Sequence, residues 1–104
     1  MTINIPAQRR LNSAAILVTL LSHTLDPATP AADWRIDSET IEGTIDVGRN
    51  ERLAERAVDT YRALFDTIGT SVAYVRHRDG KPCHVLGMVG NTLVRLVITR
   101  EAAA

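Results

Sequence analysis

The residues best suited to chemistry lie in one short segment, RHRDGKPCH, which spans residues 76–84. It holds Cys83, the only cysteine of the chain, together with His77 and His84. Imidazole and thiolate groups bind zinc, but a structural zinc site needs about four converging ligands, and no fourth candidate stands nearby. In an extended strand Cys83 would also point away from both histidines. We therefore predict no metal site and no cofactor.

The adjacent Cys83 and His84 raise a second possibility, a nucleophile with its base. Such a pair needs side chains within hydrogen-bond reach, whereas neighbours along a strand point to opposite faces. The segment DVGRNER, residues 46–52, has one glycine and is no glycine-rich phosphate loop. The helix expected after it could present amides to an anion, although ordinary capping explains it equally well. We therefore expect a protein that is not an enzyme, with a small enzyme as the third possibility.

Basic side chains around the same segment favour another class of function. If the strands on either side of Asp79 and Gly80 pair directly, Arg76, Arg78 and Lys81 share one face of the hairpin. A β-hairpin can enter a nucleic-acid groove. Charges at a sheet edge also discourage aggregation between strands without binding anything. A nucleic-acid-binding regulator that uses these three cations is therefore the alternative function.

Helical spacing dominates the first part of the chain. Residues near 7–25 predict a helix with the apolar stripe Leu11, Ala14, Leu17, Val18, Leu21 and Leu25. Ile16 and Leu20 lie on its flank, so the apolar sector is wide, which is typical of a helix buried on more than one side. A proline- and alanine-rich linker, residues 26–33, cannot continue this helix. A second helix follows Asn50, a good N-cap, and ends at Gly69.

The C-terminal segment, residues 71–99, predicts an antiparallel meander of three strands. Asp79-Gly80 is a strong hairpin signal, and Gly90-Asn91 supplies the second turn. Upstream, residues 34–36 and 41–47 indicate two short strands, with Gly43 at a bulge or a close backbone approach. The order α-β-β-α-β-β-β predicts an α+β fold with two helices packed on an antiparallel sheet. We expect one domain over residues 1–104, with frayed ends near 1–5 and 101–104.

The two faces of this meander carry different side chains. Two-residue turns place Val75 opposite His84 and Val85 opposite Leu96. The drier face then collects Val72, Tyr74, Cys83, Val85, Val89, Val94, Leu96 and Ile98. The second face collects Ala73, Val75, His77, His84, Leu86, Met88, Leu93, Arg95 and Val97. Five large apolar residues lie on this second face, and exposing each would forfeit roughly 1.5–3 kcal/mol.

Two arrangements would cover the second face. In the first, one helix packs on each face of the sheet, in three layers. In the second, both helices share the drier face, and the second face meets another copy of the chain or a different protein. A one-residue slip or a bulge would exchange some of the positions.

The charge and the amino-acid composition of the whole sequence narrow the class of protein. Twelve basic and twelve acidic residues give a net charge of zero, which argues against a general polyanion binder. A single cysteine permits no intrachain disulfide, so we expect a cytoplasmic protein. The apolar run at residues 14–21 is far shorter than the roughly 20 residues that span a membrane. Lys81 is the only lysine among many arginines, which favours a bacterial or phage origin.

These observations predict a small non-enzymatic module that binds another protein or associates with itself, as a dimer. The expected interface anchors are the apolar residues of the second sheet face, Val75, Leu86, Met88, Leu93 and Val97.

Overall fold

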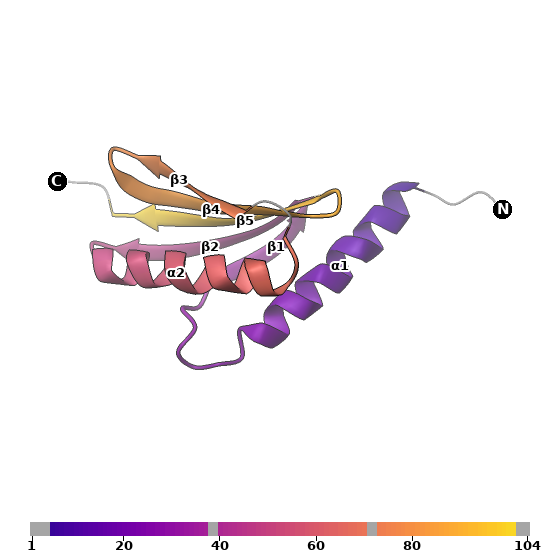
Figure 1. Ribbon diagram of the computed structural model, residues 1–104, viewed down its shortest axis with the longest axis horizontal. Coiled ribbons are helices and arrows are strands. Elements are labelled where there is room, and N and C mark those ends of the chain that lie inside the picture. Colours follow the sequence, from indigo (N-terminus) through magenta and orange to yellow (C-terminus); the bar gives the residue numbers. More distant parts are fainter. Residues whose placement is uncertain (1–4, 38–39, 71–72, 102–104) are drawn as a thin grey trace.

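The computed structural model describes residues 5–37, 40–70 and 73–101, so the ends expected to fray lie almost entirely outside it. Two helices and five strands follow the predicted α-β-β-α-β-β-β order (Figure 1). In chain order they are α1 (Ile5–His23), β1 (Asp33–Asp37), β2 (Thr40–Gly48), α2 (Glu51–Thr67), β3 (Ala73–Arg78), β4 (Lys81–Val89) and β5 (Thr92–Arg100). The protein therefore has an α+β fold that ends in a three-stranded antiparallel meander.

All five strands belong to one sheet, in the order β1-β2-β5-β4-β3. β1 pairs with β2, β3 with β4 and β4 with β5 in antiparallel fashion, whereas β2 and β5 run parallel. The sheet is mixed, and the expectation of a fully antiparallel sheet is wrong at this one pairing. Parallel neighbours need a crossover connection, and α2 lies within the connection that takes the chain from β2 to the meander.

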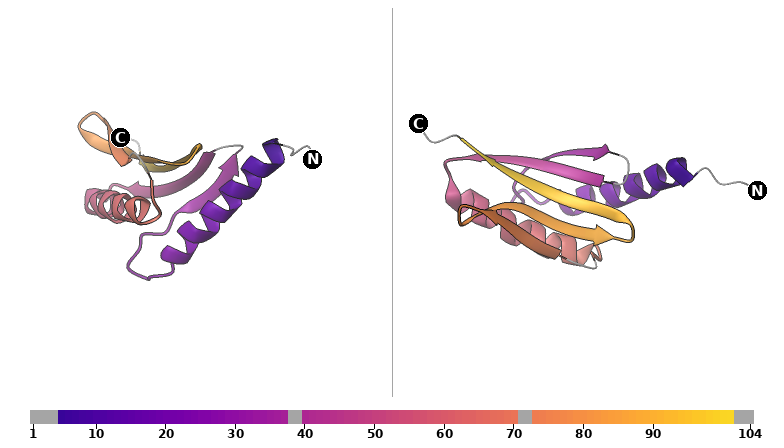
Figure 2. Two further views of the ribbon diagram at one scale, coloured as in Figure 1. Left: turned by 45° about the vertical axis from the view of Figure 1, so that its right-hand side comes forward. Right: turned by 90° about the horizontal axis from the view of Figure 1, so that it is seen from above.

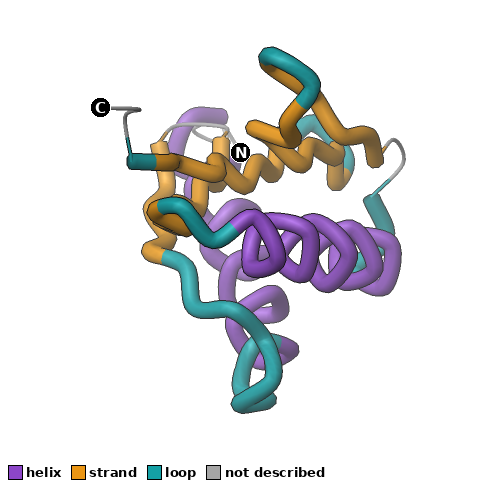
Figure 3. The backbone as a smooth tube through the Cα atoms, turned by 90° about the vertical axis from the view of Figure 1, so that its left-hand side faces the viewer, coloured by secondary structure: helices purple, strands orange, loops and turns teal. Residues whose placement is uncertain are grey.

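Both helices lie on the same face of the sheet (Figures 1 and 2). Seen end-on, the strands form one layer on one side of α2 (Figure 3). The core between helices and sheet contains the buried residues Leu20, Ile41, Ile45, Val47, Ala54, Ala57, Tyr61, Leu64, Phe65, Val85, Val94, Leu96 and Ile98. Of the two arrangements considered, the fold is the one in which both helices share the drier face.

The buried side of α1 differs from the predicted stripe. Ser13 and Leu20 are fully buried, whereas Val18 is 67% exposed and Leu25 is 82% exposed. The expectation that α1 is buried on more than one side is therefore wrong. The helix packs against β1, β2 and α2 along one line of residues, and one end of it extends beyond the sheet (Figure 1). When the apolar sector of a helix is this wide, its periodicity does not indicate which residues face the core.

Helix α2 follows its sequence closely. The Asn50 side chain accepts a hydrogen bond from the Leu53 amide at 3.0 Å, as expected of an N-cap. Gly69 has a φ of +88°, the left-handed conformation that ends many helices. The buried residues Ala54, Ala57, Tyr61, Leu64 and Phe65 form the face that meets the sheet.

A β-bulge alters the predicted register of the meander. Both turns are as expected, since Arg78 pairs with Lys81 and Val89 pairs with Thr92. Next to the first turn, His77 pairs with Pro82 and Arg76 with His84, which leaves Cys83 as an extra residue on β4. A bulge of this kind breaks the alternation of side chains along its strand.

The bulge moves Val75 to the other face. Val75 pairs with Val85 rather than with His84, and it packs against the core. The prediction that Val75 anchors an interface on the second face is therefore wrong. Tyr74 pairs with Leu86 and takes its place on that face, where it is 46% exposed.

Tyr61 links α2 to the linker before β1. Its side chain is fully buried, and its hydroxyl donates to the Pro30 carbonyl oxygen at 2.6 Å. We expect Tyr61→Phe to lower the free energy of unfolding by about 1–2 kcal/mol, because a buried carbonyl loses its partner. Urea unfolding followed by circular dichroism measures this change. The matched control is Tyr74→Phe at an exposed ring, and equal losses in the two variants would contradict the assignment.

Gly43 allows the indole of Trp34 to lie across the sheet. The two residues pair between β1 and β2, and a Cβ at position 43 would lie 2.7 Å from the Trp34 ring. We expect Gly43→Ala to cost about 1–3 kcal/mol of stability, because the ring must move from its packed position. Thr44→Ala, one residue away and on the opposite face, should cost less than about 1 kcal/mol. A Gly43→Ala midpoint equal to that of the wild type would exclude this close packing.

Candidate functional site

The sheet face away from the helices, here called the open face, is the main candidate surface. Its members follow from the strand register, alternate with the core residues and include Arg35, Thr40, Glu42, Thr44, Tyr74, Arg76, His84, Leu86, Met88, Leu93, Arg95 and Val97. No helix of the described chain lies on this face (Figure 2). Four of the five predicted anchors lie on it, Leu86, Met88, Leu93 and Val97.

The four anchors are not equally accessible. Leu86 is only 6% exposed, because it lies between Tyr74 on β3 and Arg95 on β5. Met88, Leu93 and Val97 are partly buried. The apolar part of the open face therefore offers Leu93, Val97 and the Tyr74 ring to a partner, with Leu86 beneath them.

An ion-pair row crosses three strands on the open face. Arg35, Glu42 and Arg95 are direct cross-strand neighbours on β1, β2 and β5. The Arg35 Nη2 atom lies 3.1 Å from Glu42 Oε1, and Arg95 donates to Glu42 Oε2 from Nε at 3.1 Å and from Nη2. The hydrogen bond from Arg95, assisted by the one from Arg35, lowers the pKa of Glu42 against the opposing effect of burial. No local pattern predicts this row, because it depends on the pairing of β2 with β5, which are far apart in the chain.

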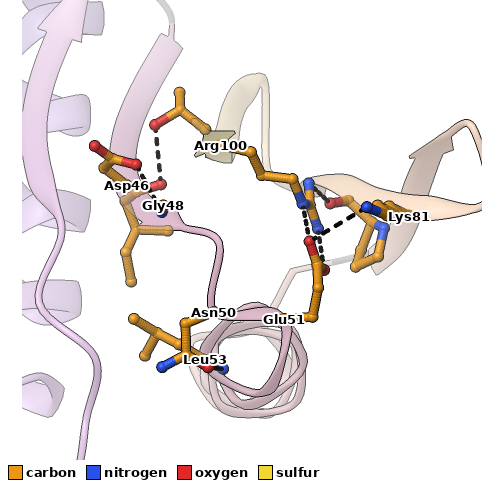
Figure 4. Close-up of polar contacts among 10 residues, drawn as sticks. Asp46, Gly48, Asn50, Glu51, Leu53, Lys81 and Arg100 are labelled. Carbon is orange, nitrogen blue, oxygen red and sulfur yellow. Dashed lines mark hydrogen bonds and ion pairs between the residues drawn. The ribbon is translucent and has the colours of Figure 1, made fainter. Parts of the chain in front are cut away.

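A second polar cluster joins the start of α2 to the meander (Figure 4). Arg100 donates to both oxygens of Glu51, from Nε at 2.7 Å and from Nη2 at 3.1 Å, and its Nη1 donates to the Pro82 carbonyl at 2.7 Å. The Arg100 hydrogen bond lowers the pKa of Glu51. Lys81 lies 3.8 Å from the same carboxylate. This cluster holds the β3–β4 hairpin against the first turn of α2.

One cation of the predicted basic patch has an acidic neighbour. Lys81 is directed toward Glu51, whereas Arg76 and Arg78 line a cavity of about 400 Å³ at the hairpin. Arg78 and Lys81 remain direct cross-strand partners and line a common cavity, so the three cations stay close together, but Lys81 is also paired with Glu51.

Cys83 and His84 lie side by side in this cavity. The Cys83 Sγ atom is 3.4 Å from His84 Nδ1 and 3.2 Å from the Arg76 carbonyl oxygen, to which the thiol donates. The expectation that Cys83 points away from His84 is wrong, because the bulge at Cys83 breaks the alternation. One feature of the sequence indicates this bulge. Pro82 lies in an internal strand, where proline is found only at bulges and strand ends.

The described residues include no group of three or more histidine, cysteine, aspartate or glutamate side chains placed to hold a metal ion. Within the same ranges, no helix has the length and apolar character needed to cross a membrane. Comparisons with protein-family models, with curated proteins and with solved structures found no match. The function is therefore argued from the geometry of this chain.

The ion-pair row makes stability depend on pH. Glu42 has a folded pKa below its ordinary value of 4.5, so its contribution to stability is complete above that value and is lost as the pH falls through the lowered one. We expect Glu42→Gln to lose more stability at pH 7 than at pH 3, measured by urea unfolding at both. Glu55→Gln, at an exposed carboxylate on α2, is the control and should show no such difference. Equal losses at the two pH values for Glu42→Gln would contradict the coupling.

Proposed function

We propose that this chain is a small non-enzymatic module that binds a second copy of itself through the open face. The observation that carries the proposal is the placement of both helices on one side of the sheet. The side chains of Leu93, Val97 and Tyr74 then remain available on the other side. Face-to-face packing of two sheets would remove these apolar side chains from water, which is favourable.

A second copy suits this face better than a partner of strong charge. The chain has no net charge, so two copies do not repel each other at long range. The open face combines an apolar centre with a row of alternating charges, Arg35, Glu42 and Arg95. A two-fold axis requires a surface that complements itself, and a surface with both signs of charge meets that condition. We assign this activity to the cytoplasm, because a chain with one cysteine gains no intrachain disulfide from an oxidising compartment.

The nucleic-acid alternative has less support. Of its three predicted cations, Lys81 is drawn to Glu51, which leaves Arg76 and Arg78. Each neutralised phosphate contributes about one unit to the salt dependence of binding, so two cations provide only weak affinity.

The test of self-association is the mass in solution. We expect the wild type to sediment at twice the chain mass at micromolar concentration and Leu93→Arg to sediment as a monomer, because the substitution places a charge in the apolar centre. Leu93 is the better position than Leu86, since Leu86 is 6% exposed and its replacement would disturb the fold itself.

The matched control is Val18→Arg on α1, at a side chain that is 67% exposed and remote from the open face. Circular dichroism verifies that both variants fold. A monomeric wild type, or equal dissociation of both variants, would refute self-association through this face.

A further inference from the structure

The cavity at the β3–β4 hairpin has a consistent chemical character. Its lining residues are Arg76, His77, Arg78, Cys83, His84, Val97 and Ile98. Two arginines and two histidines therefore line a space of about 400 Å³, and none of the described residues that line it is acidic. We call this cavity the basic pocket.

The two arginines of the basic pocket form no ion pair with a carboxylate of the described residues. Within the described residues, Glu42 is bonded to Arg35 and Arg95, and Glu51 to Arg100 and Lys81. No ion pair joins Arg76 or Arg78 to any acid of those ranges. The sheet thus satisfies the neighbouring arginines internally and leaves the guanidinium groups of the basic pocket for another anion.

The pKa of His84 is consistent with an excess of positive charge at the basic pocket. Burial lowers the pKa of His84, and the charges of Arg95, Arg76 and Arg78 lower it further, while Glu42 acts in the opposite direction. Arg76 and Arg78 are on β3 and Arg95 is on β5, the two strands that flank His84 on β4, whereas Glu42 is on β2, beyond β5. A bound anion would offset the arginine charges and favour the protonated imidazole.

We propose that the basic pocket binds the phosphate group of a small phosphomonoester. Guanidinium groups present paired N–H donors that match the oxygens of a phosphate. Pockets for small molecules have volumes of about 300–1,000 Å³, and the basic pocket is large enough for an organic group attached to the phosphate. Val97 and Ile98 supply an apolar wall for that group, and the Cys83 thiol lies beside it.

The single thiol allows a direct test. Cys83 is the only cysteine, so its alkylation can be followed by mass spectrometry without a background. We expect the ratio of its rates with anionic iodoacetate and neutral iodoacetamide to fall about tenfold in the double variant Arg76→Gln/Arg78→Gln, which is the lower end of electrostatic steering. Arg62→Gln, at an exposed arginine on α2, is the matched control and should leave the ratio unchanged.

Phosphate compounds then compete with the reagents. We expect phenyl phosphate to protect Cys83 from iodoacetamide more strongly than inorganic phosphate does, while sodium chloride at equal ionic strength does not protect. An unchanged rate ratio in the double variant, no protection by phenyl phosphate, or no reaction with either reagent would overturn the proposal. Protection by a short DNA duplex but not by phenyl phosphate would overturn it in favour of nucleic acid.

Two further measurements keep the test independent of folding and of self-association. In the wild type, phenyl phosphate should raise the pKa of His84 measured by NMR, and a constant value would count against binding. Alkylation of the Leu93→Arg variant repeats the rate comparison whether or not the chain forms a dimer. Because Arg76, His84 and Val97 belong to both the open face and the basic pocket, the Leu93→Arg variant shows whether the pocket binds phosphate when no second copy covers the open face.

Discussion

Parallel pairing between β2 and β5 is the constraint on which the rest of the structure depends. It joins the β1–β2 hairpin to the meander and so makes one sheet from two segments far apart in the chain. The same pairing places Ile41 beside Val94 and Ile45 beside Ile98, in the core beneath α2. On the other face it places Glu42 beside Arg95. A connection between parallel strands must cross the sheet, and α2 therefore has to cover the face that it crosses.

The ion pair between Glu51 and Arg100 joins the start of α2 to the end of the meander. Glu51 is in the first turn of α2, Arg100 is the last residue of β5, and Pro82 is near the start of β4. A bidentate arginine–carboxylate pair fixes orientation as well as distance. The hairpin that carries the basic pocket is therefore oriented by the same helix that covers the core.

Elements with strong local signals could be predicted from the sequence, whereas long-range pairing could not. Asn50, Gly69 and the Asp79-Gly80 turn determine boundaries through backbone conformation, which a sequence displays directly. The meeting of Glu42 with Arg95 spans 53 residues and leaves no local trace. The alternation of residues places Leu86 and Leu93 together on one face, but it leaves open what covers that face, and it misplaces Val75 because the bulge at Cys83 shifts the alternation.

Helix α1 has a consequence for how the molecule opens. Ser13 is fully buried and its hydroxyl has no hydrogen-bond partner among the described residues, while Leu25 is largely in solvent. An element with few buried apolar contacts has a low free energy of local opening. We therefore expect the amides of α1 to exchange their hydrogens through a partial unfolding in which α2 and the five strands stay paired, so that the two helices belong to different cooperative units.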